Sequence, residues 1–181
     1  LINYGRFLHE VRGDVDIVKL MYKKALAVAP EDATALCNFG DFFFDVCHDT
    51  EKAEAMYARA AAVPPDNGTV LDCYARLLQK IDKGDKAQQI FERAIAASPD
   101  SGSVLNNYGC FLQKRGNYDK AEEMFKRAVA ASPKKVTILI NYGAFLLDVR
   151  RSLSRAEVMF DRALALEPED GSVLGNYARL L

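Results

Sequence analysis

The fold is decided by two neighbouring stretches, Leu105-Asn-Asn-Tyr-Gly-Cys-Phe-Leu112 and Lys120-Ala-Glu-Glu-Met-Phe-Lys-Arg-Ala-Val129. In each, apolar or small residues recur at i, i+3, i+4 and i+7, which is the pattern of an amphipathic helix. The aromatic residue of the first stretch recurs at steps of 35, 35, 34, 34 and 35, at Tyr4, Phe39, Tyr74, Tyr108, Tyr142 and Tyr177. A fixed step of this size predicts stacked repeats, each made of a helix A and a helix B.

A proline follows each predicted helix B, at Pro30, Pro65, Pro99, Pro133 and Pro168. Proline ends a helix because it lacks the backbone N–H and clashes with the preceding turn. Two residues later the sequence places Asp32, Asn67, Ser101 or Asp170, whose side chains are expected to cap the next helix A. Lys135 stands at the same place in the fifth repeat and predicts the weakest helix start.

The spacing of the aromatic residues predicts where the repeats are strict. The step from a helix-B aromatic to the next helix-A aromatic is always 17, as from Phe125 to Tyr142, whereas the step within a repeat is 17 or 18. We therefore expect the one-residue variation to lie in the turn inside each hairpin, because loops tolerate insertions better than packed faces do.

Small residues recur at one position of helix A, which is Gly5, Gly40, Gly109 and Gly143, with Ala75 and Ala178 in the other repeats. Glycine within a helix costs about 1 kcal/mol relative to alanine, so its recurrence needs a reason. Alanines such as Ala53 and Ala121 recur on helix B, and we expect small residues on both helices to bring the two axes close together.

These patterns together resemble the tetratricopeptide repeat (TPR) family. The resemblance lies in the 34-residue step, the Leu-x-x-Tyr-Gly-x-x-Leu helix A, the Ala-x-x-x-Phe-x-x-Ala helix B and the closing proline. It implies an all-α fold, a right-handed α-solenoid of stacked antiparallel helix pairs, over residues 1–181 as one array. The expected repeats are approximately 1–32, 33–67, 68–101, 102–135 and 136–170, with 171–181 as helix A of a sixth. The B helices are also similar to half-a-TPR (HAT) repeats, although these usually carry a tryptophan and the chain has none.

The resemblance further implies a concave groove lined by the A helices, in which family members bind an extended peptide or a partner's helix. Inward positions carried over from the family are Asn3, Asn38, Asn107, Asn141 and Asn176, with Cys73 interrupting the series. An asparagine amide both donates and accepts, as binding to a peptide backbone requires. The alternative is that these asparagines are satisfied locally on their own helices. Phe44, from the run Phe42–Phe44, is a further candidate because all three rings cannot face one core.

Composition and motifs argue against catalysis and against several ligand classes. The net charge of −1 disfavours direct nucleic-acid binding, and no apolar run predicts a membrane helix. No phosphate-binding loop, nucleophile motif or paired-histidine motif occurs. We therefore expect no enzyme activity, no cofactor and no metal, and interpret Cys37, Cys73 and Cys110 as small apolar residues. Cysteine usage favours an intracellular, cytoplasmic protein.

The sequence thus predicts a non-catalytic protein–protein interaction scaffold that belongs to a longer protein or a large assembly. Two alternatives stay open, a substrate-docking arm of an enzyme whose catalytic domain lies elsewhere and a HAT-like scaffold of RNA processing. At the C-terminal end, Leu174, Tyr177 and Leu181 predict an apolar stripe that further repeats or another subunit would cover.

Overall fold

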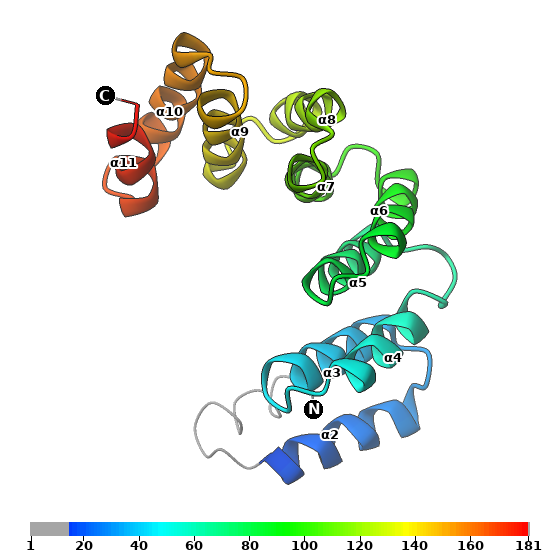
Figure 1. Cartoon of the computed structure of the whole chain (residues 1–181). Coiled ribbons are helices and arrows are strands. Elements are labelled where there is room, and N and C mark those ends of the chain that lie inside the picture. The colour runs from blue at the N-terminus through cyan, green and yellow to red at the C-terminus, as the bar shows by residue number, and fades with distance from the viewer. Residues whose placement is uncertain (1–14, 181) are drawn as a thin grey trace. The chain divides into compact units, whose positions relative to one another are not determined.

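The structure, a computed structural model, describes residues 15–180, and these residues form helices joined by short connections (Figure 1). Asn3 and the expected first helix A lie outside the described residues, as does Leu181. Between residues 15 and 180, no helix combines the length and the apolar character that crossing a bilayer requires. The helices are α2 Val15–Val28, α3 Ala33–Asp45, α4 Thr50–Ala60, α5 Gly68–Lys80, α6 Gly84–Ala97, α7 Gly102–Lys114, α8 Tyr118–Ala131, α9 Val136–Asp148, α10 Leu153–Leu166 and α11 Gly171–Ala178.

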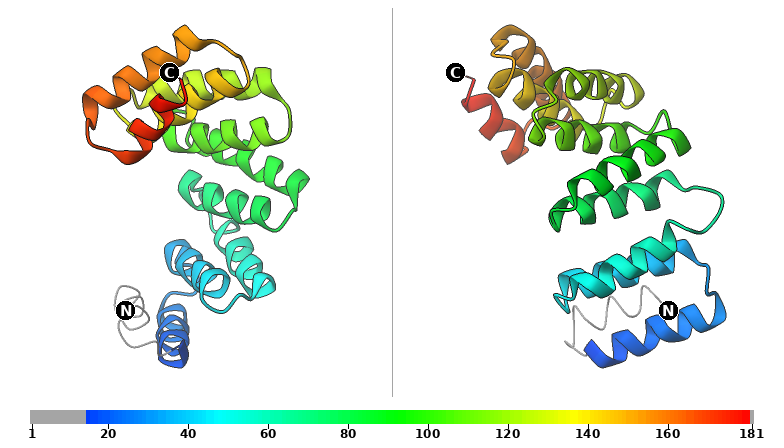
Figure 2. Two further views of the ribbon diagram at one scale, coloured as in Figure 1. Left: turned by 60° about the vertical axis from the view of Figure 1, so that its left-hand side comes forward. Right: turned by 45° about the vertical axis from the view of Figure 1, so that its right-hand side comes forward.

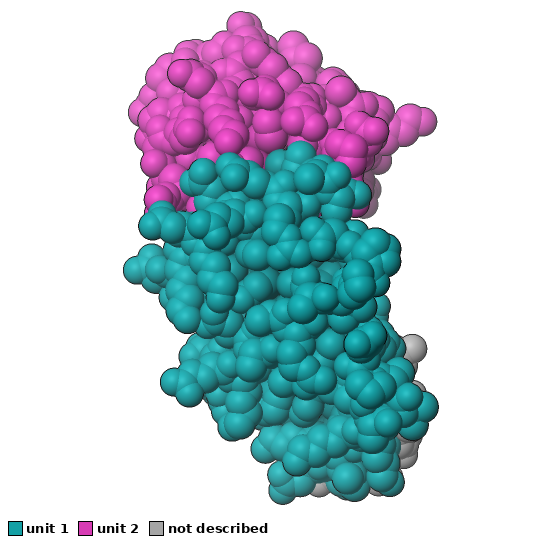
Figure 3. All heavy atoms as spheres, turned by 90° about the vertical axis from the view of Figure 1, so that its right-hand side faces the viewer, with its two compact units in different colours: residues 1–97 teal, residues 98–181 magenta. Residues whose placement is uncertain are grey.

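The chain forms two compact units, Leu1–Ala97 and Ser98–Leu181, coloured separately in Figure 3. In unit 1, α3 pairs with α4 and α5 pairs with α6, and α2 packs on α3. In unit 2, α7 pairs with α8 and α9 with α10, and α11 packs on the latter pair. Each pair is an antiparallel hairpin, as the views of Figure 2 show. The expected all-α fold of paired helices is confirmed, whereas the extension of one array over all six repeat ranges stays a prediction.

The helix caps follow the predicted pattern. The side chains of Asp32 and Asp170 accept hydrogen bonds from the backbone N–H groups of Ala35 and Val173, at 3.0 and 2.9 Å. Asn67 and Ser101 cap α5 and α7 in the same way. Lys135 stands at the start of α9 and provides no side-chain cap, as the sequence predicted.

The turn inside each hairpin absorbs the variation in length. Each turn closes with a backbone N–H that bonds back to the last turn of helix A. The bond spans five residues in α5–α6 and α7–α8 (Lys83 to Leu78, Asn117 to Leu112) and six in α3–α4 and α9–α10 (Asp49 to Phe43, Ser152 to Leu146). The six-residue turns belong to the repeats with the 18-residue step, which confirms the location of the variation. Every one of these turns contains a residue with positive φ, at His48, Asp82, Gly116 and Arg151.

The constant 17-residue step corresponds to a ring contact between successive hairpins. Tyr57 of α4 stacks on Tyr74 of α5, with ring centroids 6.1 Å apart and planes at 4°. Phe125 of α8 and Tyr142 of α9 are likewise stacked, at 5.9 Å and 21°. Such ring pairs contribute about 0.5–1.5 kcal/mol beyond the area that they bury. The invariant step therefore keeps each helix B in register with the helix A that follows it.

A second contact recurs between each of several B helices and the proline after the preceding helix B, and it was not predicted. The guanidinium of a helix-B arginine donates to the carbonyl of the proline that ends the preceding helix B. The pairs are Arg59 with Pro30 (3.5 Å), Arg127 with Pro99 (3.2 Å) and Arg162 with Pro133 (3.1 Å). Arg93 instead bonds the carbonyl of Ala61 and the carboxylate of Asp66. Each of these bonds ties a helix B to the connection that follows the preceding helix B.

The recurring glycine is explained by the close packing of helix B on helix A. A Cβ atom at Gly143 would lie 2.6 Å from the ring of Phe160, and one at Gly40 would lie 2.7 Å from the ring of Tyr57. The helix-B aromatic ring therefore lies closest to the glycine, and the carbonyl of the helix-B alanine Ala53 also lies near, 3.4 Å from a Cβ built at Gly40. The ring needs the space because it also packs on the next hairpin, so the smallness of this position supports the contact between repeats.

Substitution of Gly143 by Ala is expected to destabilise the protein, because the new methyl group would displace the fully buried ring of Phe160. Overpacking of this kind costs about 1–3 kcal/mol, which outweighs the gain in helix propensity. Gly175→Ala in α11 is the matched control, because a Cβ there meets no atom within 4 Å. It should stabilise by up to about 1 kcal/mol. Urea unfolding measures both, and a stabilising Gly143→Ala would contradict the packing argument.

Candidate functional site

The helix-A face of unit 2 carries a chain of three asparagines. Asn141 of α9 donates its Nδ2 to Oδ1 of Asn106 on α7, at 3.1 Å. Asn106 in turn donates its Nδ2 to Oδ1 of Asn107, at 3.4 Å. Asn106 is buried, with 5% of its surface exposed, whereas Asn107 and Asn141 are half-buried. The asparagine relay (Asn141, Asn106, Asn107) thus joins two of the predicted positions through a residue that the sequence had not singled out.

The other predicted asparagines are placed differently. Asn38 is half-buried on α3 in unit 1, and its side chain makes no hydrogen bond with another described residue. Asn176 is held by its own helix, since its Nδ2 donates to the carbonyl of Ser172 at 2.8 Å and its Oδ1 accepts from Arg179 at 3.1 Å. The structure therefore brings Asn107 and Asn141 together and leaves Asn38 and Asn176 outside the relay.

Phe44 differs from its two neighbours in the aromatic run. Phe42 and Phe43 are buried in a ring cluster with Phe39, whereas Phe44 is half-buried. The ammonium of Lys80, on α5, lies 4.8 Å from the centroid of the Phe44 ring. A cation in this position is attracted to the face of the ring. Its role as a binding anchor stays a prediction.

A polar pocket of about 490 Å³ opens beside the asparagine relay. It lies where the amino-terminal ends of α9 and α11 approach each other within unit 2. Its lining, called the polar pocket below, consists of Lys134, Lys135, Val136, Thr137, Ile140, Asn141, Glu167, Asp170 and Ser172. The lysines lie on the connection before α9 and the carboxylates on the connection before α11. The lining therefore offers both signs of charge, hydroxyl groups and an amide. Polar groups that converge in a concave site are typical of ligand recognition.

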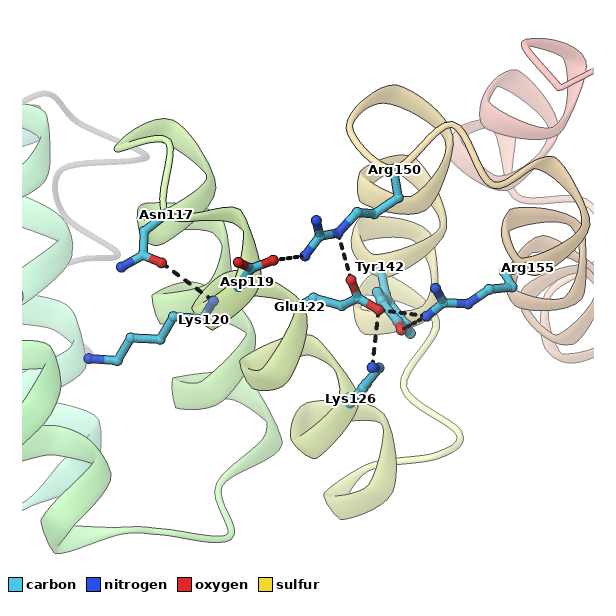
Figure 4. Close-up of polar contacts among 8 residues, drawn as sticks. All are labelled: Asn117, Asp119, Lys120, Glu122, Lys126, Tyr142, Arg150 and Arg155. Atoms are coloured by element: carbon cyan, nitrogen blue, oxygen red, sulfur yellow. Dashed lines mark hydrogen bonds and ion pairs between the residues drawn. The ribbon is translucent and has the colours of Figure 1, made fainter.

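A buried carboxylate, that of Glu122, joins helices of unit 2 to one another (Figure 4). Glu122 of α8 accepts hydrogen bonds from Arg150 at 2.6 Å and from Arg155 at 2.7 Å. It also forms an ion pair with Lys126 at 3.1 Å. Arg155 also donates to the hydroxyl of Tyr142 on α9 at 2.7 Å. The network therefore ties α8 to α9, to α10 and to the turn between them.

The surroundings of Glu122 favour its charged form. Burial alone would raise the pKa of this carboxyl, but the hydrogen bonds from Arg155, Lys126 and Arg150 outweigh it and lower the pKa from 4.5 to about 2. Glu54 of α4 has the same role in unit 1, where Lys83 and Lys86 bind it at 2.5 and 2.8 Å. These ion pairs, about 30 residues apart in the sequence, were missed because no short motif marks them.

The cysteines on the helix-A face are reduced and shielded. Burial, with smaller contributions from Cys73 and Asp41, raises the pKa of the Cys37 thiol to about 12. Burial also raises the pKa values of Cys73 and Cys110. A neutral, buried thiol is neither a good nucleophile nor a ready metal ligand. Within residues 15–180 no three His, Cys, Asp or Glu side chains are grouped as metal ligands.

The paired helices, the ring contacts between hairpins and the polar helix-A face define a TPR-like repeat protein. Solved structures share this fold. One is titled "Functional Characterization of Pseudomonas Aeruginosa pilF". The match covers 99% of the present chain and 80% of the chain in that structure, with 21% identity and a TM-score of 0.80. TTC0263, a thermophilic TPR protein of Thermus thermophilus, has 18% identity and a TM-score of 0.76, over 99% and 96% of the two chains. YrrB, described as a TPR protein with an unusual peptide-binding site, has 22% identity and a TM-score of 0.68, over 99% and 90%.

The sequence itself identifies the family. Residues 71–176, more than half of the chain, match the model of the cilia and flagella-associated protein 70 middle TPR-like domain. The chain belongs to this family. A search of proteins with curated descriptions finds no match.

Glu122→Gln is expected to remove a contribution to stability that depends on pH. Because the folded-state pKa lies below the unfolded value, this contribution is present above pH 4.5 and is lost as the pH falls towards 2. The shift corresponds to at most about 3 kcal/mol, which screening by solvent reduces to about 1–2 kcal/mol at neutral pH. Urea unfolding between pH 2 and pH 7 should give a lower and flatter stability curve for the variant. Glu123→Gln, at the exposed neighbouring position, is the control. Equal curves for Glu122→Gln and the native chain would rule out the network as a stabilising element.

Proposed function

We propose that the chain is a non-catalytic scaffold domain of a longer ciliary protein and that its helix-A face binds an extended segment of a partner protein. The family supports the ciliary setting by its description, which favours the cilium over the cytoplasm at large. The family description names no enzyme, which weighs against a docking arm for catalysis. The net charge of −1 weighs against a scaffold that binds RNA directly.

The asparagine relay is the observation that carries the proposal. Its members form one hydrogen-bonded row from α9 to α7, and Asn141 also lines the polar pocket. Because the row is fixed from the buried side by Asn106, the amide of Asn141 is held in one orientation before a ligand arrives. Preorganised polar groups lose less entropy on binding, which favours recognition of a peptide backbone there.

Asn141→Ala is expected to weaken peptide binding about tenfold, as the loss of one or two hydrogen bonds to the ligand would do. Its cost to folding should be about 1–3 kcal/mol, because loss of this bond leaves the buried Oδ1 of Asn106 without the donor Asn141. The probes are peptides selected on the 181-residue chain from a displayed library of random linear sequences. Fluorescence anisotropy at a temperature where circular dichroism shows both proteins folded gives the affinities.

Asn176→Ala is the matched control, because its amide is engaged by its own helix and lies outside the polar pocket. It should leave the affinities unchanged. Unaltered binding by Asn141→Ala would count against the proposal, and an unfolded Asn141→Ala protein would favour a purely structural role for the asparagines.

We also propose that an amphipathic helix of the helix-B pattern covers α11 in the longer protein. Leu174 is 48% exposed, whereas its equivalents Leu71, Leu105 and Leu139 are at most 1% exposed under their own B helices. Tyr177 is half-buried, whereas Tyr142 is 5% exposed. The face that an Ala-x-x-x-aromatic helix covers in α3–α4, α5–α6, α7–α8 and α9–α10 is thus open on α11, and a helix of that same pattern fits it.

Leu174→Asp tests this proposal by comparing two lengths of polypeptide. In the 181-residue chain the change should alter the melting temperature little, because the side chain is already half exposed. In a longer natural chain that includes the next helix, it should destabilise by about 2–4 kcal/mol, as a charge placed in a core does. An equal, small effect in both would show that no helix covers this face.

A further inference from the structure

The polar pocket has two rims of opposite charge. Lys134 and Lys135 precede α9 on one side, and Glu167 and Asp170 precede α11 on the other. Among the described residues, none of these four side chains forms an ion pair. Lys135 donates to the hydroxyl of Ser103 at 2.6 Å, and Asp170 accepts from the backbone N–H of Val173 at 2.9 Å. Within the described part of the chain, the ammonium of Lys134 and the carboxylate of Glu167 have no hydrogen bond of their own, so both charges are available to a ligand.

The basic rim is peculiar to this repeat. The two residues after the closing proline are Glu31 and Asp32, Asp66 and Asn67, Asp100 and Ser101, and Glu169 and Asp170 in the other repeats. Only before α9 are both replaced by lysine, and the replacement gives up the side-chain cap that every other described helix A has. Residues that serve binding often break a local rule of stability. The missing cap at Lys135, beside the pocket, fits such a role.

Asn141 of the asparagine relay gives the pocket a third point of contact, beside its two charged rims. Asn141 donates one N–H of its Nδ2 to Asn106, so its second N–H and its Oδ1 remain for the pocket that it lines. An amide oxygen accepts and cannot donate. The Oδ1 of Asn141 therefore suits a ligand N–H at a point between a cationic rim and an anionic rim.

On these observations we infer that the polar pocket selects an extended peptide segment of mixed charge. A backbone N–H of the segment binds Oδ1 of Asn141, an acidic side chain lies at Lys134 and Lys135, and a basic side chain lies at Glu167 and Asp170. The inference rests on the proposed function and names its ligand class. A peptide with one sign of charge would place like charges together at one rim, which gives the pocket its discrimination.

Selection of displayed random linear peptides on the 181-residue chain tests the inference. The peptides that depend on Asn141 should carry Asp or Glu and Lys or Arg at a fixed separation. Lys134→Glu with Lys135→Glu should weaken their binding about tenfold or more. Adding Glu167→Lys to this variant should restore binding of a peptide in which the two charges are exchanged. Such a rescue depends on complementarity, and loss of structure cannot produce it.

The control is Lys23→Glu with Lys24→Glu, an adjacent pair of exposed lysines on α2 in unit 1. This double variant makes the same change in net charge and should keep the native affinities. If selected peptides need Asn141 but are indifferent to reversal of the rims, the inference is wrong and the proposed function stands. If the native chain selects no peptide, the proposed function fails and the inference falls with it.

Discussion

The structure depends on one contact, the packing of a helix-B ring on the ring of the next helix A. This contact fixes the 17-residue step and brings the ring of Tyr57 or Phe125 against its successor. It also explains the glycine or alanine of helix A, since a ring that contacts two hairpins leaves no room for a larger side chain beneath it. Sequence features that look independent, the step, the aromatic positions and the small residue, are thus consequences of a single packing requirement.

Around this apolar contact, the hairpins are joined by charged groups whose partners are far apart in the sequence. Glu122 gathers two arginines and a lysine from three segments, and Glu54 gathers two lysines. A buried carboxylate is tolerated only because several donors surround it. The aromatic contact sets the register in which successive hairpins pack. The ion pairs stabilise that register only, because a slipped hairpin would leave a buried charge without its partners.

The fold could be predicted from the sequence because its signals are local and repeated. Helix periodicity, closing prolines and caps such as Asp32 act within a few residues, and even the missing cap at Lys135 was readable. The candidate site could be predicted only in part. Asn107 and Asn141 belong to a repeated position, but Asn106 does not, and its place in the relay results from the offset between α7 and α9. The contact of the Phe160 ring with Gly143 could not be predicted in the same way, because side-chain direction, unlike spacing, is set by the packed partner.

The turns of the four described hairpins contain residues in a left-handed backbone conformation. Each closes on a residue with positive φ, yet only Gly116 is a glycine, and His48, Asp82 and Arg151 adopt the same left-handed geometry. A side chain in that region costs about 1–2 kcal/mol relative to a relaxed backbone. Substitution of these three residues by glycine would therefore gain stability at positions that do not line the polar pocket. Such stabilising substitutions could offset the loss of stability caused by changes in the binding face that would otherwise unfold the domain.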